Sequence, residues 1–172
     1  MIFCDIHACV GCRMCEVACS TRHFGAVSPA MARIRVAKLE ESGIDLAITC
    51  VSCVEKFCLT CPSDALVTGA RGEIRVDPES CNACLTCVEA CPIGAAGFYG
   101  GQPLFCDLCG GEPACVIACP TAALSCRDDY LDTPLRAFSG FRGSSSQKRA
   151  RFAQAQGEPV RSGWKEGRRI DS

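Results

Sequence analysis

The sequence predicts a small α+β protein, built from tandem units of short hairpins and short helices and followed by an extended C-terminal tail. Three observations predict this fold: four cysteine runs recur, alternating segments with glycine turns separate them, and the composition changes near residue 136. The runs are Cys9-Cys12-Cys15-Cys19, Cys50-Cys53-Cys58-Cys61, Cys81-Cys84-Cys87-Cys91 and Cys106-Cys109-Cys115-Cys119. They use 16 of the 18 cysteines in a chain of 172 residues.

Short strands are predicted at both ends of the cysteine-bearing region, at residues 2–5 and 122–126, and we expect them to pair. The interval after the first run holds a longer hairpin, in which residues 33–38 alternate, Ser42-Gly43 turns the chain and residues 46–49 return. Because basic side chains follow one face of this hairpin, we expect a half-exposed sheet.

The second and third intervals repeat one pattern of strand, glycine-containing turn and strand. Residues 65–68, 69–72 and 73–77 form the first copy, and residues 95–99, 100–102 and 104–105 form the second. Each unit is predicted to pass from a cysteine loop into a short helix that ends at Cys-Pro. The first run ends at Cys19-Ser20, without proline, so its helix is free to continue.

The cysteine usage indicates metal chemistry in a reducing compartment. The N-terminal Met-Ile-Phe-Cys-Asp has no basic region, apolar core or cleavage site of a secretory signal, which favours a cytoplasmic protein. In such a compartment Cys-x-x-Cys motifs indicate metal binding more often than disulfide bridges. No apolar run approaches the roughly 18 residues of a membrane span, so we expect no direct membrane insertion.

The spacing within the runs favours iron–sulfur clusters. Cys-x-x-Cys-x-x-Cys wraps a loop so that three thiolates reach three corners of one cube, and in two-cluster ferredoxins the fourth cysteine of each run ligates the other cluster. Zinc is the competing ligand, but zinc modules separate their cysteine pairs by longer loops and often add histidine, and this chain has 2 histidines. Since the second position of every run is cysteine, we predict four [4Fe-4S] clusters.

In these motifs residues 1 to about 127 resemble the four-cluster, ferredoxin-like iron–sulfur subunits of molybdenum and tungsten oxidoreductases, formate dehydrogenases and hydrogenases. The resemblance implies tandem bacterial ferredoxin-like units in which runs one and four exchange their last cysteines, as do runs two and three. The implied ligand sets are Cys9, Cys12, Cys15 with Cys119; Cys106, Cys109, Cys115 with Cys19; Cys50, Cys53, Cys58 with Cys91; and Cys81, Cys84, Cys87 with Cys61.

Two spacings depart from the family's pattern. Run two has two residues between Cys58 and Cys61 where the family usually has three, so Cys61 is the ligand with the weakest match. Run four has five residues between Cys109 and Cys115, which predicts a trimmed loop and not a lost site. The remaining thiols, Cys4 and Cys126, are interpreted as buried apolar groups on the paired terminal strands. His7 is interpreted as a satisfied or solvated side chain.

The function that the resemblance implies is electron transfer without catalysis. The chain has no G-x-G-x-x-G, no P-loop and no nucleophile elbow. The implied partners are a catalytic oxidoreductase subunit with a tungsten or molybdenum pterin, of the aldehyde oxidoreductase or aromatic acyl-CoA reductase type, and a second redox subunit or another copy of the chain. A cluster-based sensor that binds nucleic acid is disfavoured, because no helix-turn-helix pattern follows the clusters.

The charge distribution divides the chain into a cluster domain at residues 1–136 and a basic extension at residues 137–172. The first part carries 10 Lys and Arg against 16 Asp and Glu, and the second carries 8 against 3. A linker at 139–146 and a short helix at 147–156 are predicted. Composition alone favours a disordered tail. Phe138, Phe141, Phe152 and Trp164 instead favour docking on a partner, or a scaffold in which the tail of one copy holds the next.

Overall fold

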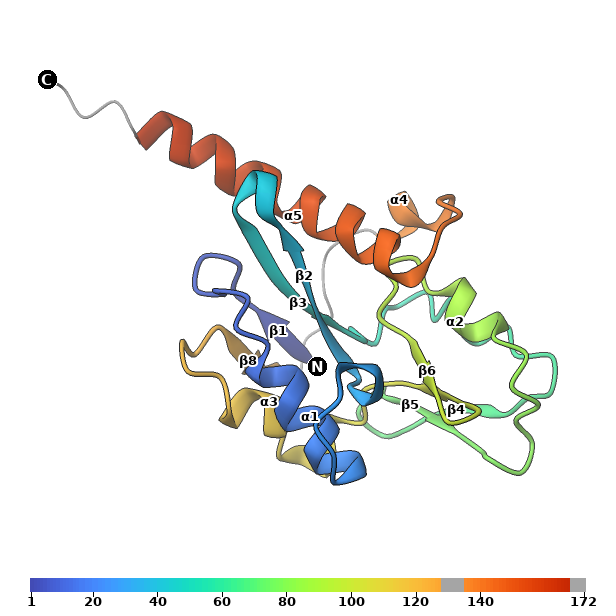
Figure 1. Cartoon of the computed structure of the whole chain (residues 1–172). Coiled ribbons are helices and arrows are strands. Elements are labelled where there is room, and N and C mark those ends of the chain that lie inside the picture. The colour runs from blue at the N-terminus through green and yellow to red at the C-terminus, as the bar shows by residue number, and fades with distance from the viewer. Residues whose placement is uncertain (128–134, 168–172) are drawn as a thin grey trace, which may run out of the picture.

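The fold is α+β, as predicted, with four two-stranded sheets and short helices arranged around the cysteine loops (Figure 1). The computed structural model describes residues 1–127 and 135–167, with side chains as far as residue 163. Its elements are β1 (Ile2–Cys4), α1 (Met14–Phe24), η1 (Pro29–Met31), β2 (Ile34–Leu39), η2 (Glu40–Ser42), β3 (Ile44–Thr49), β4 (Leu66–Thr68), β5 (Ile74–Val76), α2 (Thr86–Ala90), β6 (Gly97–Tyr99), β7 (Gln102–Leu104), η3 (Leu108–Gly111), α3 (Ala114–Ile117), β8 (Leu124–Cys126), α4 (Arg136–Ser139) and α5 (Ser145–Gly167).

The terminal strands pair, as predicted. β1 and β8 are antiparallel, with Ile2 opposite Cys126 and Cys4 opposite Leu124. The Asp5 amide extends the pairing by donating to the Ala123 carbonyl at 2.7 Å. The prediction for Cys126 was wrong in one respect, because this thiol is exposed at the end of a two-stranded sheet. Pairing of the two strands brings the two ends of the cysteine-bearing region together.

The three predicted hairpins are confirmed, and each is an antiparallel pair: β2–β3, β4–β5 and β6–β7. Their turns use glycine where the backbone enters the left-handed region, as at Gly43 with φ 64°. The β6–β7 turn uses Gly100 and Gly101 in the same way, with φ 59° and 81°.

In three of the four runs a helix begins one residue before the third cysteine and contains it. α1 continues past Cys19 to Phe24, as expected without a proline there, whereas α2 ends immediately before Cys91. Run two is the exception, because the described chain has no helix between Cys53 and Cys61. Two residues between Cys58 and Cys61 are fewer than one helical turn, so the shortened spacing also removed the predicted helix.

The C-terminal extension folds back onto the chain's own core. Phe138 and Phe152 are buried, and their rings meet edge to face at 5.3 Å between centroids. They pack in one apolar cluster with Leu46, Ile48 and Ile93. The expectation that these two aromatic side chains anchor a partner was therefore wrong. The side chain of Trp164 and residues 168–172 lie outside the described part of the chain.

α5 is longer than the predicted helix at 147–156 and begins with a capping box. The Ser144 hydroxyl accepts from the Gln147 amide at 3.3 Å, and the Gln147 side chain accepts from the Ser144 amide at 2.8 Å. This reciprocal pair converts the end of the predicted linker into a defined helix start.

The β2–β3 hairpin is covered on both faces, which corrects the expectation of a half-exposed sheet. Leu46 and Ile48 pack in the apolar cluster of Phe152 and Ala153 on α5. Ile34 and Ala47 pack in a second cluster with Cys15 and Cys19 on α1. In Figure 1, α5 runs along the hairpin, and both helices contact β2. The covering of this face was not predicted, because α5 comes from a segment rich in charged and small residues.

Basic residues of α5 bind backbone carbonyls of α2 and of the loop that follows the third cysteine run. The Lys148 ammonium donates to the Glu89 carbonyl, and the Arg149 guanidinium donates to the Gly94 carbonyl at 2.7 Å. Gly94 has φ 64°, and a Cβ added there would lie 2.2 Å from the Ser145 carbonyl oxygen. The start of α5 therefore depends on the absence of a side chain at residue 94.

Gly94→Ala is expected to displace the start of α5, whereas Gly100→Ala is the matched control. Both glycines have positive φ, so either alanine costs about 1–2 kcal/mol of backbone strain. Gly100 has no heavy atom within 4 Å of the added Cβ, so only Gly94→Ala adds a collision, worth about 1–3 kcal/mol. We expect its apparent melting temperature to lie roughly 5 °C below that of Gly100→Ala in anaerobic circular dichroism. Equal melting temperatures would contradict the docking of α5.

Candidate iron–sulfur sites

The four cysteine loops share one local backbone conformation. The residue immediately before the second cysteine of each run has positive φ. These residues are Gly11, Ser52, Ala83 and Leu108, with φ 62°, 48°, 58° and 58°. A left-handed residue at this point curls the loop, so that its cysteines and successive amides face one concavity. Run two keeps this conformation despite its shortened end.

We define four sites, each numbered by the run that provides three of its cysteines. Site 1 is Cys9, Cys12, Cys15 with Cys119; site 2 is Cys50, Cys53, Cys58 with Cys91; site 3 is Cys81, Cys84, Cys87 with Cys61; site 4 is Cys106, Cys109, Cys115 with Cys19.

Sites 2 and 3 each have their four cysteines around one cavity. The cavity at site 2 is lined by its four cysteines and by apolar side chains that include Phe57, Ile93 and Phe105. The cavity at site 3 is lined by Cys61 together with all three cysteines of run three. The structure thus places Cys91, the last cysteine of run three, beside run two. It also places Cys61, with its unusual spacing, beside run three.

Site 4 brings together cysteines that are distant in sequence. Burial raises the pKa of Cys115, and the neighbouring Cys106 and Cys19 raise it further. Cys19 lies on α1, so it reaches the cysteines of run four from the other end of the cluster domain. The contact between α1 and α3 holds the two segments together.

Site 1 is formed by three cysteines of run one together with Cys119. Burial raises the pKa of Cys15 to about 12, and Cys9 and Cys12 are among the nearby groups that raise it. Cys119 packs against the apolar cluster that contains Cys15.

The residues fit iron–sulfur clusters in donor type and environment. Burial raises the pKa of Cys50 and Cys58 to about 12. A thiolate in such surroundings needs cationic charge beside it, which the iron of a cluster supplies. Soft thiolate donors in dry, apolar cavities are the ligands that iron–sulfur clusters use.

The last cysteine of every run has a hydrogen-bonding partner that orients its sulfur. The Arg33 amide donates to Cys19 Sγ at 3.2 Å, and the Ala95 amide donates to Cys91 Sγ at 3.3 Å. Hydroxyl groups pair with the other two: Ser63 Oγ lies 3.5 Å from Cys61 Sγ, and Thr121 Oγ1 lies 3.7 Å from Cys119 Sγ. The sulfur that crosses between runs is therefore held in place by local partners.

Packing between cysteine-bearing segments connects neighbouring sites. Cys15 of site 1 and Cys115 of site 4 belong to one apolar cluster. Phe105, which directly precedes Cys106 of site 4, lines the cavity of site 2. Cys58 of site 2 and Cys87 of site 3 belong to another apolar cluster. This packing connects the sites in the order 1, 4, 2, 3.

Comparison with known proteins identifies the family of this chain. Residues 74–96, which contain run three, match the family model described as a 4Fe-4S binding domain. The aliphatic sulfonate oxidoreductase, polyferredoxin-like subunit of Pyrococcus furiosus is 43% identical over 66% of this chain and 68% of its own length. The electron transport protein HydN of Escherichia coli K12 is 34% identical over 74% of this chain and 87% of its own length.

The chain belongs to the family of polyferredoxin-like electron-transport subunits. It binds [4Fe-4S] clusters and serves in electron transfer. A solved structure described as "Active site complex BamBC of Benzoyl Coenzyme A reductase in complex with Benzoyl-CoA" contains a chain that is 26% identical, with a TM-score of 0.45, over 80% of this chain and 84% of that one. Within residues 1–127 and 135–167 this polyferredoxin-like subunit has no helix long and apolar enough to span a membrane.

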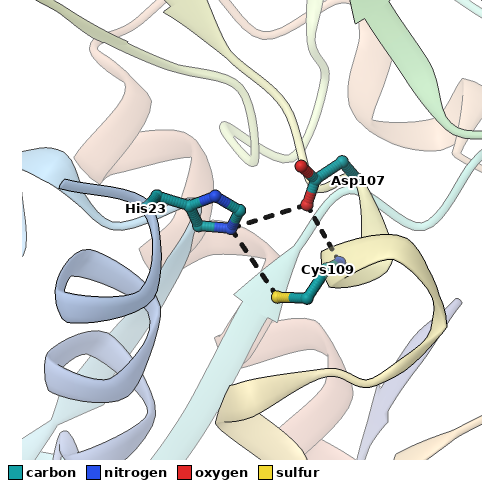
Figure 2. A group of neighbouring side chains, drawn as sticks. All are labelled: His23, Asp107 and Cys109. Carbon is teal, nitrogen blue, oxygen red and sulfur yellow. Dashed lines mark hydrogen bonds and ion pairs between the residues drawn. The ribbon is translucent and has the colours of Figure 1, made fainter. Parts of the chain in front are cut away.

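Three residues beside site 4 of this polyferredoxin-like subunit were not predicted: His23, Arg33 and Asp107. Figure 2 shows the His23 ring facing both Asp107 and Cys109, with Nε2 lying 3.5 Å from Asp107 Oδ1 and 3.6 Å from Cys109 Sγ. Arg33 forms an ion pair with the other oxygen of Asp107 at 2.5 Å. Burial, followed by the Arg33 charge, lowers the pKa of His23. In the sequence, the one indication that His23 lies near a ligand is its position one helical turn after Cys19. Its contact with Cys109 joins residues 86 positions apart.

His7, by contrast, is exposed, and its amide donates to the Asp5 side chain at 2.9 Å, as expected for a solvated residue.

Proposed function

We propose that the chain relays single electrons through four [4Fe-4S] clusters held at sites 1 to 4, without catalysing a reaction itself. The observation that carries the proposal is the gathering of cysteines from two runs around one cavity at both site 2 and site 3. A [4Fe-4S] cluster, when bound, accepts and donates one electron. The chain's own residues supply the thiolate ligands, exclude water from the buried sulfurs and orient the crossing cysteines.

We infer a relay order of sites 1, 4, 2 and 3 from the packing between neighbouring sites. The two terminal sites of this order contain the exposed ligands, Cys12 at site 1 and Cys84 at site 3. Each site has at least one buried cysteine, but at sites 4 and 2 none of the four cysteines is exposed. Sites 1 and 3 are therefore the proposed entry and exit points, while sites 4 and 2 form the interior of the relay.

The proposed partners are a catalytic oxidoreductase subunit at one end and a second redox protein at the other. The relative from Pyrococcus furiosus is itself named as a subunit of an oxidoreductase. We assign a tungsten or molybdenum pterin to the catalytic subunit because the cysteine motifs resemble the electron-transfer subunits of such enzymes. The proposed compartment is the cytoplasm, where reducing conditions keep the 16 thiols of the four runs available for iron.

Anaerobic purification of the tagged full chain from its own organism tests the partner assignment. We expect a larger subunit to co-purify, with tungsten or molybdenum in stoichiometric amount. Its substrate should reduce the clusters of the complex, whereas the separated chain should show no reaction with the same substrate. A complex without a pterin metal would contradict the partner assignment, and turnover by the separated chain would contradict the non-catalytic role.

A further inference from the structure

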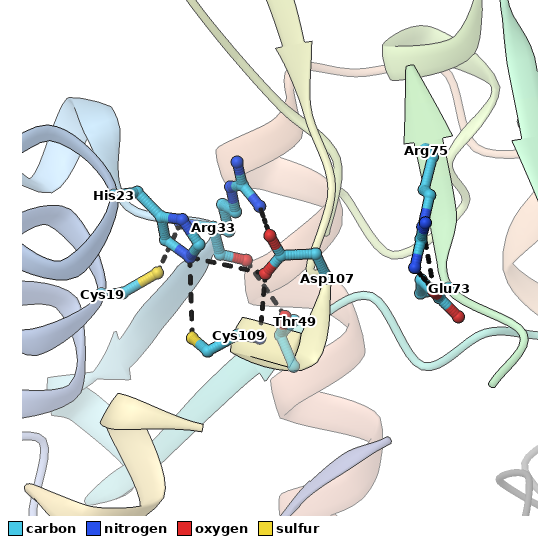
Figure 3. Close-up of polar contacts among 8 residues, drawn as sticks. All are labelled: Cys19, His23, Arg33, Thr49, Glu73, Arg75, Asp107 and Cys109. Carbon is cyan, nitrogen blue, oxygen red and sulfur yellow. Dashed lines mark hydrogen bonds and ion pairs between the residues drawn. The ribbon is translucent and has the colours of Figure 1, made fainter. Parts of the chain in front are cut away.

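A polar network next to site 4 connects two cysteines that come from distant parts of the chain. Cys19 and His23 lie one turn apart on α1, and Arg33 directly precedes β2. Asp107 directly precedes η3, and Cys109 lies within it. Figure 3 shows these side chains converging between α1 and the loop of run four. The network therefore spans the point where run one and run four meet.

Asp107 organises the network by using both carboxylate oxygens. Oδ1 accepts from the Cys109 amide at 3.0 Å and lies 3.5 Å from His23 Nε2. Oδ2 pairs with the Arg33 guanidinium at 2.5 Å. The carboxylate thus fixes the backbone of Cys109, the ring of His23 and the side chain of Arg33 at the same time.

The neighbours of His23 determine which ring nitrogen carries its proton. Nε2 faces a carboxylate oxygen and the Cys109 sulfur, and both of these accept hydrogen bonds when Cys109 is a thiolate. Nε2 is therefore the protonated nitrogen and presents its N–H toward Cys109 Sγ. Arg33 adds a second donor to the same site, because its amide donates to Cys19 Sγ at 3.2 Å.

We propose that His23 is a positioning residue that raises the reduction potential of the cluster at site 4, with Arg33 and Asp107 holding its ring in place. Reduction adds one negative charge to the cluster, and an N–H donor on a ligand sulfur stabilises the more negative state. Of the chain's 2 histidines, both described, His23 is the one in contact with a cysteine of a site. This inference rests on the proposed function, because it requires a cluster at site 4.

The test is a redox titration of the anaerobically purified full chain, with dithionite as the electron donor and electron paramagnetic resonance as the readout. His23→Phe removes the donor, His23→Gln retains an N–H donor, and His7→Phe alters the exposed histidine as a control. We expect His23→Phe to lower the midpoint potential of one cluster and leave the other three in place. His23→Gln should recover part of the shift, and His7→Phe should match the natural chain. Unchanged potentials in His23→Phe with full iron content would overturn the proposal.

A second measurement needs no substitution and so does not depend on the folding of a variant. The natural chain, grown with ¹⁵N-labelled histidine, should show a weak ¹⁵N coupling to one reduced cluster in pulsed resonance spectra. Reduced clusters with no histidine coupling would overturn the inference and leave the proposed function intact. A chain without iron–sulfur clusters would instead overturn the proposed function itself.

Discussion

Cys91→Ala is expected to remove the cluster at site 2 and to leave the cluster at site 3 in place. Cys91 belongs to run three in sequence, yet it lines the same cavity as Cys50, Cys53 and Cys58. Loss of one cysteine leaves one iron of the cluster without a protein ligand. We therefore expect the iron content to fall from about 16 to about 12 atoms per chain.

The identity of the lost cluster decides whether the ligands cross. Cys91→Ala should lose the same paramagnetic signal as Cys53→Ala, whereas Cys61→Ala should lose the same signal as Cys84→Ala. Cys126→Ala is the control, because this exposed thiol belongs to none of the four sites, and it should retain about 16 iron atoms. If Cys91→Ala instead matched Cys84→Ala, each run would hold its own cluster and the crossed arrangement would be wrong.

Phe152→Ala is expected to destabilise the folded chain strongly and to loosen α5. Phe152 is 5% exposed and packs against Phe138 in the cluster that includes Leu46 and Ile93. Truncation of a buried phenylalanine costs about 3–5 kcal/mol, which corresponds to a fall of roughly 10 °C in apparent melting temperature for a chain of this size. Because α5 holds the Gly94 loop through Arg149, cluster loss on heating should also begin earlier at site 2.

Gln154→Ala is the matched control for Phe152→Ala, since Gln154 lies exposed on the same helix. Thermal denaturation is followed by circular dichroism for the helices and by absorbance near 400 nm for the clusters. We expect Gln154→Ala to melt with the natural chain. Identical melting of Phe152→Ala and Gln154→Ala would show that α5 does not pack on this core in solution.

The sequence was most informative where structure depends on local spacing. Glycine turns and alternating segments predicted the three hairpins, and the cysteine spacing predicted the curled loops, because each depends on residues within one short segment. The pairing of β1 with β8 was also predicted, since a strand flanks each of the outermost runs. The Cys58 to Cys61 spacing was recognised as unusual, but its consequence, the absence of a helix, required the structure.

Features that depend on contacts between distant segments were predicted poorly. The aromatic side chains of residues 137–172 favoured docking on a partner, and a short helix at 147–156 was predicted, but its packing on the chain's own core was not. Lys148 and Arg149 carry positive charge, yet they bind backbone carbonyls of the cluster domain. The contact of His23 with Cys109 joins residues 86 positions apart. The position of His23 one helical turn after Cys19 indicates that it lies near a ligand, but not that it reaches the loop of run four.

The most direct test of the relay is to count iron, sulfide and electrons in one anaerobic preparation of the full chain. Four [4Fe-4S] clusters predict about 16 iron atoms, about 16 acid-labile sulfides and about four electrons taken up per chain on reductive titration. A colourless chain loaded with zinc, or an uptake of no more than about two electrons with half of the iron, would contradict four electron-carrying sites.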